Sequence, residues 1–224
     1  AMNVNDLICV GAEPLAFVDY VAVPQTEPGV HAVLGASLSE GCSRARVTLA
    51  GGETATLPGI VSELDLSGTA LGWFPRGGGV TGEGLEAGDV LIGLPSSGLH
   101  SNGYTLVRAV LERSGCSLEG PAPFDEEHPS REVARFPGCS GAVSLGEVLL
   151  NPTRIYVDPV ADLIMESRGG GGVCEDGSIK AIAHITGGGL SNLLRLHESL
   201  GWHIAEPLSA QPEFEWIAEV GSVD

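Results

Sequence analysis

Basic side chains are scarce in this sequence. Among 224 residues, 11 are lysine or arginine and 29 are aspartate or glutamate, Lys180 is the only lysine, and the formal net charge is -18. A protein that binds nucleic acid or an anionic membrane surface through its electrostatic field needs a basic patch. We therefore expect neither nucleic acid nor membrane among the partners. An anionic ligand would have to be held by backbone amides, helix ends and metal ions.

Long apolar runs and cysteine motifs are also missing. No uninterrupted apolar stretch of about 18 residues occurs, and the first residues lack the basic and then apolar layout of a signal peptide, so we expect a cytoplasmic protein. With 43% hydrophobic residues, the chain has enough material for the core of one large or two small globular domains. The cysteines show no C-x-x-C spacing, which favours reduced thiols over a disulfide framework or a zinc site: Cys9, Cys42, Cys116, Cys139 and Cys174.

The stretch Gly88–Arg108 has the pattern of a strand, a tight polar loop and a helix. An apolar run at 90–94 is followed by Pro-Ser-Ser-Gly-Leu-His-Ser-Asn-Gly, and apolar residues at helical spacing begin at Tyr104. The first N–H groups of such a helix point into the loop, where the helix dipole favours an anion such as phosphate. The alternative is that Ser101 or Asn102 simply caps the helix and the glycines only make the turn.

A second junction of the same kind follows later. Residues 179–185 predict a strand, Thr186-Gly187-Gly188-Gly189 a turn, and residues 191–200 a helix. Two such junctions make a shared role in anion binding more plausible than either would alone. Nearer the N-terminus, Gly51-Gly52-Glu53-Thr54 at the end of a predicted strand would allow close backbone approach to a ligand, although Gly-Gly also makes ordinary turns.

The remaining elements indicate an α/β protein. We expect helices within 1–10, with Gly11 placed to stop the first, and within 28–45, 144–150 and 155–167, and strands at 15–23, 45–49 and 64–73. Residues 117–141, with several prolines and acids, predict an irregular surface excursion. The glycine-rich stretch 76–88 is typical of a domain boundary, which predicts an N-terminal domain at 1–78 and a C-terminal domain at 88–224.

Five motifs occur in the order in which one known family has them. They are Asn5-Asp6 through Gly11-Ala12-Glu13-Pro14, Gly51 to Ala55 with Pro58-Gly59, Ser96 to Arg108, Pro152 to Tyr156, and Ala183 to Leu190. The first fits the D-x-x-x-x-G-A-x-P signature of the aminoimidazole ribonucleotide (AIR) synthetase superfamily, and the others resemble the AIR synthetases within it. The resemblance implies a two-domain α/β fold. Strands of the N-terminal domain would pair across a dimer to form a barrel, and the C-terminal domain would be an α/β sandwich.

The resemblance also implies a reaction in purine biosynthesis. ATP would activate the formyl oxygen of formylglycinamidine ribonucleotide by phosphorylation, and an amidine nitrogen would close the imidazole ring with loss of phosphate. ATP and Mg²⁺ are the implied cofactors and a homodimer the implied assembly. Family members carry a D-G-V-G-T-K-type segment before the position of Ala1 and a T-F-N-x-G-type segment after that of Asp224. We therefore expect a chain truncated at both ends, which could be inactive alone.

Carried over by resemblance, Asp6 is a magnesium ligand, since a hard carboxylate suits that ion, and Glu53 is a weaker metal candidate. Both also belong to the implied ATP site, whose other members are Asn5, Gly11, Ala12, Pro14, Gly51, Gly52 and Thr54. The alternative for Asp6 is a capping or solvent-facing carboxylate. Asp19 lies inside its apolar strand. It could support the residues that hold the metal or serve as a structural hydrogen-bond acceptor, and we prefer the structural role.

The implied cradle for the 5′-phosphate of the ribonucleotide comprises Ser96, Ser97, Gly98, Ser101, Asn102, Gly187 and Gly188. Two histidines are the candidates for a catalytic role. His100 could bind the phosphate or act as an acid, and a structural histidine in a loop is equally compatible with the sequence. His184 could donate near the reacting amide, although a histidine satisfied at a strand end is the commoner case. Arg154 and Arg108 are either partners of substrate charge or ordinary helix-face residues.

Two other functions remain open at this point. One is another ATP-dependent branch of the superfamily, such as the formylglycinamidine ribonucleotide synthetases, thiamine-monophosphate kinases or selenophosphate synthetases, which share the Asp6–Pro14 signature. The other is a non-catalytic module for binding or dimerisation.

Overall fold

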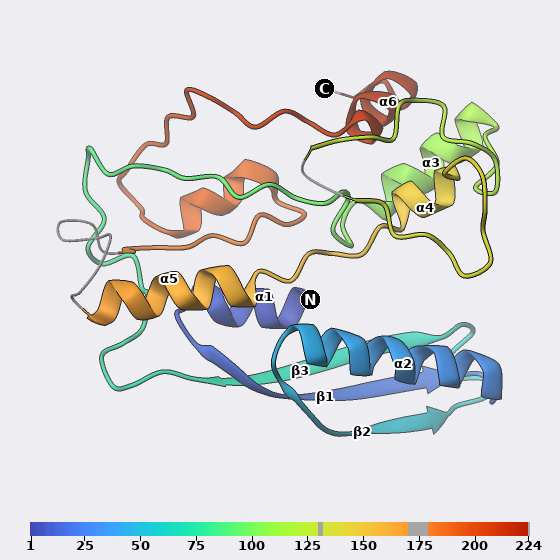
Figure 1. Cartoon of the computed structure of the whole chain (residues 1–224), viewed down its shortest axis with the longest axis horizontal. Helices are drawn as coiled ribbons and strands as arrows, with labels where there is room; N and C mark the ends of the chain where they lie inside the picture. Colours follow the sequence, from blue (N-terminus) through green and yellow to red (C-terminus); the bar gives the residue numbers. More distant parts are fainter. Residues whose placement is uncertain (130–131, 170–178, 224) are drawn as a thin grey trace. The chain divides into compact units, whose positions relative to one another are not determined.

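The computed structural model describes residues 1–129, 132–169 and 179–223 (Figure 1). It contains two compact units. The first unit comprises Ala1–Leu85, Ile155–His184 and Leu194–Glu198, and the second comprises Glu86–Arg154, Ile185–Leu193 and Ser199–Asp224. Each unit therefore combines stretches that are distant in the sequence, and the predicted boundaries at 78 and 88 stay a prediction. Cys174 lies outside the described residues.

A three-stranded sheet with the order β2-β1-β3 forms the framework of the first unit. β1 (Glu13–Val23) runs parallel to β2 (Thr48–Thr56) and antiparallel to β3 (Asp65–Trp73). Helix α2 (Pro28–Arg44) connects β1 to β2, as the crossover of a parallel pair requires. The strands predicted at 15–23 and 64–73 are confirmed. The strand predicted at 45–49 begins only at Thr48 and continues to Thr56, so the Gly-Gly-Glu-Thr segment lies inside β2 and not at a strand's end.

One apolar cluster holds the helices of the first unit to this sheet. Val4 and Ile8, four residues apart on α1 (Met2–Cys9), are 3% and 2% exposed. They pack with Val160 and Ile164 of α5 (Val157–Gly169), and Phe17 of β1 lies against the same cluster. Spacing of three and four residues places such side chains on one helix face, and burial of each stabilises the fold by about 1.5–3 kcal/mol.

Gly11 ends α1, as the sequence predicts. Its φ is +77°, a conformation that side chains disfavour. A Cβ there would lie 2.9 Å from Cγ2 of Val80 and 2.7 Å from Nη2 of Arg168. Arg168 donates hydrogen bonds to the carbonyl oxygens of Gly11 and Gly78. The chain that follows α1 is thereby fixed to α5.

The face of the sheet opposite Phe17 is apolar and exposed. The register places Val18 and Tyr20 of β1 on that face, with Leu71 of β3 alongside. Tyr20, Val18, Trp73 and Leu71 are 39%, 41%, 58% and 64% exposed. An apolar surface of this kind is typical of a site covered by a partner.

The second unit is built around three helices, α3 (Tyr104–Ser114), α4 (Leu145–Leu149) and α6 (Pro212–Gly221). Val107 and Val110 of α3 pack with Trp216 and Ile217 of α6. The hydroxyl of Tyr104 donates to the carbonyl oxygen of Leu149, with 2.6 Å between the oxygens. The helices predicted after Gly103 and within 144–150 are confirmed.

Three predicted elements are wrong. Residues 90–94 and 179–185 form no strand, and a 3-10 helix, η1 (Gly189–Arg195), replaces the α-helix predicted at 191–200. An apolar run becomes a strand only where a neighbouring strand completes its hydrogen bonds. Across the described ranges, the strands of the sheet are β1 to β3 alone, so both runs lack a neighbouring strand.

No helix in these ranges has the length and apolarity needed to cross a bilayer.

Glu147 is an enclosed carboxylate at the start of α4. Its side chain is 1% exposed and lies 2.9 Å from Nε of Arg135. Oε1 also accepts from the N–H of Phe136, and Oε2 from the N–H of Ser144, whose hydroxyl in turn accepts from the N–H of Glu147. This is a capping box. The bonds from Ser144, Arg135 and Phe136 lower the pKa of Glu147 to about 2.

Because the pKa of Glu147 is lower in the folded state than in the unfolded state, its ionised carboxylate stabilises the fold, and this stabilisation is lost in acid. The contribution is full above the ordinary value of 4.5 and disappears as the pH falls towards about 2. We expect Glu147→Gln to lower the urea midpoint strongly at pH 7 and much less at pH 3. Urea unfolding at several pH values measures this. Glu112→Gln, on the exposed surface of α3, is the matched control, and an equal loss for Glu147→Gln at pH 7 and pH 3 would contradict the assignment.

Candidate functional site

The turn before α3 contains several residues with positive φ. We call residues 96–103 the serine turn. His100 and Ser101 have φ values of +49° and +60°, between Gly98 at +140° and Gly103 at +76°. Positive φ is uncommon for residues other than glycine and persists where the surroundings hold it. The conformation of the serine turn must therefore be fixed by neighbouring groups.

The imidazole of His100 is one of these groups, and it is 8% exposed. Its Nε2 lies 2.8 Å from the backbone nitrogen of Ser97 and 3.3 Å from that of Arg154, and both N–H groups donate to it. A ring nitrogen that accepts such bonds carries no proton, so His100 is neutral with its proton on Nδ1. Nε2 is thus engaged within the protein. This geometry supports the structural alternative for His100 over a role as acid.

The segment 151–154 closes the serine turn from another side. Nδ2 of Asn151 donates to the carbonyl oxygen of Ser97 at 2.7 Å, and the Ser97 hydroxyl lies 3.0 Å from the carbonyl oxygen of Pro152. The hydroxyls of Ser101 and Thr153 lie 2.9 Å apart. Sequence reasoning assigned no role to Asn151 or Thr153. Their only signal was the Pro-Thr-Arg-Ile-Tyr motif, which contains Thr153 and directly follows Asn151.

Arg154 is tied to the same segment of the chain. Its Nη1 donates to the carbonyl oxygen of Pro95 at 3.1 Å. This bond places a guanidinium next to the serine turn. Arg108, in contrast, lies on the exposed surface of α3.

The second predicted turn, residues 186–192, is called the glycine turn. A Cβ on Gly188 would lie 2.9 Å from Oδ1 of Asn192 and 3.2 Å from Oγ of Ser191. Asn192 is 3% exposed and cannot easily move away. The Ser191 hydroxyl also donates to the Gly188 carbonyl at 2.6 Å. Glycine at 188 is therefore required by close packing.

The two turns meet within the second unit. A Cβ on Gly187 would lie 3.5 Å from Oδ1 of Asn102. Asn102 is oriented by its own Nδ2, which donates to the His100 carbonyl at 2.6 Å. Gly103, the N-cap of α3, has no side chain with which to cap the first N–H groups of the helix. Uncapped N–H groups beside two glycine-containing turns can bind an anion such as a phosphate.

In the first unit, Asp6 and His184 form a pair. Oδ1 of Asp6, on α1, lies 2.7 Å from Nδ1 of His184. The Asp6 side chain is 70% exposed and the His184 side chain 12% exposed. Nε2 of His184 is buried and has no hydrogen-bond partner among the described residues. A carboxylate on one ring nitrogen orients the imidazole and leaves the other nitrogen available for proton transfer.

The neighbouring Asn5 has a structural contact. It is 2% exposed, and its Oδ1 accepts from the N–H of Tyr156 at 3.1 Å. This bond ties the predicted nucleotide segment to the start of α5. It leaves the adjacent Asp6 facing outwards.

Asp19, for which the sequence favours a structural role, and Glu53, the weaker metal candidate, differ in their surroundings. A Cβ on Gly52 would collide with the carboxylate of Asp19, so the Asp19 side chain lies directly against Gly52 on that face of the sheet. Glu53 is exposed on β2, opposite Tyr20 of β1. Within the described ranges, no three histidine, cysteine or acidic side chains gather as a metal site. Mg²⁺ commonly takes one or two carboxylates and completes its shell with phosphate oxygens and water. The exposed Asp6 fits an ion held in that way.

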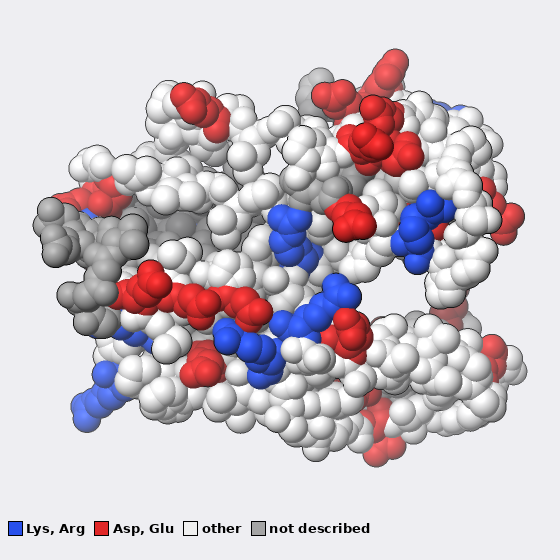
Figure 2. Space-filling model, in the orientation of Figure 1, with Lys and Arg blue, Asp and Glu red and all other residues white. Residues whose placement is uncertain are grey.

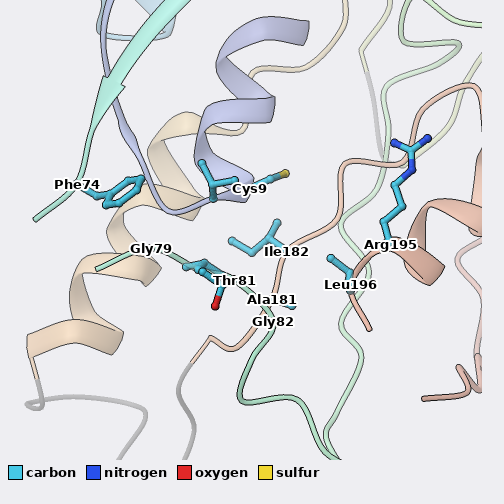
Figure 3. Close-up of a pocket in the computed structure, with 11 residues that line it drawn as sticks. Cys9, Phe74, Gly79, Thr81, Gly82, Ala181, Ile182, Arg195 and Leu196 are labelled. Atoms are coloured by element: carbon cyan, nitrogen blue, oxygen red, sulfur yellow. The ribbon is translucent and has the colours of Figure 1, made fainter. Parts of the chain in front are cut away.

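A cavity of about 580 Å³ in the first unit lies beside the end of α1 (Figure 3). Phe74 and Arg195 lie on opposite sides of it, and its other lining residues are Cys9, Val10, Gly79, Val80, Thr81, Gly82, Ala181, Ile182 and Leu196. Burial, followed by the charge of Asp6, raises the pKa of the Cys9 thiol to about 11. The thiol is therefore protonated at neutral pH. Sequence reasoning missed the cavity because its lining comes from several distant segments.

Acidic side chains are prominent on the molecular surface (Figure 2). On α5, Asp158, Asp162 and Glu166 follow one another at intervals of four residues, which places them on one face of the helix. Asp158 is paired with Arg46, with 2.6 Å between its Oδ1 and Nε of Arg46.

These features define an α/β protein with two compact units, one of them carrying two joined turns suited to an anion. AIR synthase related proteins match the chain in two parts, with their N-terminal domain at residues 1–74 and their C-terminal domain at 86–222. The chain belongs to the AIR synthase related protein family.

Individual relatives support this assignment. The chain is 41% identical over 224 residues to a phosphoribosylformylglycinamidine cyclo-ligase of Methanosarcina acetivorans, covering all of this chain and 59% of that protein. It is 44% identical over 221 residues to the protein of that name from Methanothermobacter thermautotrophicus, covering 99% of this chain and 58% of the relative. The chain thus spans somewhat more than half the length of these relatives.

The glycine turn allows a matched test of close packing. We expect Gly188→Ala to destabilise the protein by about 1–3 kcal/mol, because the added methyl group collides with the buried Asn192 side chain. Gly187→Ala adds a methyl group at ordinary contact distance from Asn102 and should change stability by less than about 0.5 kcal/mol. Urea denaturation of both variants measures the difference. Equal losses would show that the two positions do not differ in packing.

Proposed function

We propose that this chain provides the catalytic groups for ATP-dependent ring closure of formylglycinamidine ribonucleotide to AIR in purine biosynthesis. The observation that carries the proposal is the contact of the serine and glycine turns in the second unit, in a chain whose relatives carry the cyclo-ligase name. A ribonucleotide presents a 5′-phosphate. Neutral N–H groups at turns and at a helix N-terminus suit that phosphate where basic side chains are few.

The 5′-phosphate would be held by the second unit. The N–H groups of the serine turn and of the first residues of α3 are its donors, together with the Ser101 hydroxyl and the Asn102 amide. The Ser97 hydroxyl and the His100 ring keep the turn in place from behind. Gly187 and Gly188 allow the phosphate to approach the backbone without interference from side chains.

The nucleotide groups are on the first unit. Asp6, with Glu53 as the weaker candidate, would hold Mg²⁺, which neutralises phosphate charge when it is bound. Asn5, Gly11, Ala12 and Pro14 would form one wall of the ATP site, and Gly51, Gly52 and Thr54 of β2 another. The joining of Gly11 to α5 through Arg168 supports a rigid wall.

His184 is the proposed group for proton transfer. Its Nδ1 faces Asp6, which fixes the ring, and its Nε2 has no partner among the described residues. Ring closure requires the amidine nitrogen to lose a proton as it bonds to the activated carbon. An oriented imidazole can accept that proton, and general base catalysis of this kind is worth roughly 10²- to 10⁴-fold in rate.

The test is turnover with formylglycinamidine ribonucleotide and Mg-ATP. We expect release of ADP that depends on this substrate. We expect Asp6→Asn to reduce it at least about tenfold, since the negative charge that would hold the metal and that faces His184 is lost. A coupled ADP assay and calorimetry with Mg-ATP measure the two effects. Asp65→Asn, on the exposed edge strand β3, is the matched control.

The outcomes separate the possible functions. ADP release with thiamine monophosphate instead of formylglycinamidine ribonucleotide would assign the chain to another branch of the superfamily. Absence of both Mg-ATP binding and turnover would favour a non-catalytic module. Unchanged Mg-ATP affinity in Asp6→Asn would remove Asp6 from the site.

The exposed sheet face supports a homodimer. Val18, Tyr20, Leu71 and Trp73 would be covered by the same face of a second copy, which also removes the exposed sheet surface from water. We expect Leu71→Asp to shift sedimentation equilibrium from dimer to monomer, and Ile60→Asp, at an exposed position outside the strands, to leave the dimer intact. A wild-type monomer at high concentration would contradict the dimer.

A cytoplasmic location follows from the proposed use of ATP and soluble intermediates.

A further inference from the structure

Gln211 makes the polar contacts that join the start of α6 to the serine turn. It is 4% exposed, and its Nε2 donates to the carbonyl oxygen of Ser96 at 2.7 Å. The same Nε2 lies 3.1 Å from the Ser96 hydroxyl, which donates to Oε1 of Gln211 at 3.4 Å. The two residues are 115 positions apart in the sequence. Both ends of one buried amide therefore contact the residue at which the serine turn begins.

These contacts are separate from helix capping. Gln211 occupies the N-cap position of α6, yet its side chain makes no capping hydrogen bond. The N–H of Phe214 donates instead to the backbone carbonyl of Gln211, which a side-chain substitution leaves in place. Pro212, at the first helical position, has no N–H that needs a cap. The amide of Gln211 is thus directed to the serine turn and away from its own helix.

The base from which Gln211 extends is rigid. Trp216 and Ile217 of α6 are buried in the core of the second unit. Glu213 is 0% exposed, and its Oε1 lies 3.4 Å from the position that a Cβ on Gly98 would occupy. The start of α6 therefore contacts the serine turn at Gly98 as well as at Ser96. A side chain held by a packed helix positions its partner more accurately than one on a loop.

The serine turn is consequently held at successive residues from different parts of the chain. Gln211 holds Ser96, Asn151 holds the carbonyl of Ser97, and His100 accepts from the N–H of Ser97. These hydrogen bonds fix the backbone at Ser96 and Ser97. They thereby also restrict His100 and Ser101, the two residues of the turn other than glycine that have positive φ. A binding site gains affinity when such a turn is ordered before the ligand arrives, because less conformational entropy is lost on binding.

We propose that Gln211 is a positioning residue, which orders the serine turn through Ser96 and thereby raises its affinity for the phosphate of a ribonucleotide. The identity of this ligand rests on the proposed function. The ordering of the turn does not, and it can be measured without any ligand.

The experiment combines hydrogen exchange with ligand binding in Gln211→Leu and Gln211→Glu. Leucine removes both polar contacts. Glutamate keeps the volume and an acceptor for the Ser96 hydroxyl but loses the donor to the Ser96 carbonyl. Gln25→Leu, at an exposed position before α2, is the matched control. Amide exchange at residues 98–103 is measured by NMR, and the dissociation constant of ribose 5-phosphate by calorimetry, both well below the melting temperature.

We expect both Gln211 variants to speed exchange at residues 98–103 and to weaken ribose 5-phosphate binding, each by about tenfold, as loss of one or two buried hydrogen bonds predicts. Exchange in the core residues of α3 should stay at the wild-type rate, and Gln25→Leu should match the wild type in every measurement. A merely structural role would lower the melting temperature and speed exchange throughout the second unit, with no preference for the turn. If Gln211→Leu does not fold, Gln211→Glu decides.

The possible failures are distinguishable. Wild-type exchange rates at residues 98–103 in folded Gln211 variants would overturn the positioning role, whatever the ligand. Faster exchange in the turn with unchanged ribose 5-phosphate affinity would overturn its connection to binding. Faster exchange in a protein whose wild type binds no ribose 5-phosphate would leave Gln211 as the residue that orders the turn and overturn the phosphate cradle of the proposed function.

Discussion

Two backbone N–H groups, of Ser97 and Arg154, donate to one ring nitrogen of His100, and the candidate anion site of the second unit depends on this arrangement. The shared acceptor joins segments more than fifty residues apart and requires a neutral imidazole. It also holds His100 in a left-handed conformation that few residues adopt without support. The N–H groups of Ser97 and Arg154 are thereby satisfied within the protein. The N–H groups later in the serine turn are the ones that a ligand could use.

The charge composition explains why such a scaffold is needed. With 11 basic and 29 acidic residues, the chain has few cations with which to attract a phosphate, and Arg154 has one guanidinium nitrogen on the Pro95 carbonyl. Backbone donors are neutral, so their contribution depends on correct orientation more than on long-range attraction. In the proposed phosphate site, accurate placement of the serine turn by His100, Asn151 and Gln211 would therefore compensate for the low number of basic side chains.

Local patterns predicted most helices and the strands of the three-stranded sheet, because α1, α3 and β1 combine clear apolar periodicity with glycine or proline at their ends. The runs at 90–94 and 179–185 have an equally strong strand pattern but no neighbouring strand in the described chain. Strand formation is decided by that neighbour, which local pattern does not reveal. Asn151 and Gln211 were missed for a related reason, since their partners in the serine turn lie 54 and 115 positions away.

The two candidate histidines could be separated only by the partners of each ring nitrogen. In His100, Nε2 accepts from the backbone, so protonation there would break bonds that hold the turn. In His184, Nδ1 faces Asp6 and Nε2 has no partner among the described residues, so the ring is oriented on one side and leaves the other nitrogen for the proposed role. Asp6 then serves two proposed partners with one carboxylate. Its Oδ1 faces His184, and at 70% exposure the group still has room for an ion at its other oxygen. Metal binding and orientation of the base would thereby be coupled through one side chain.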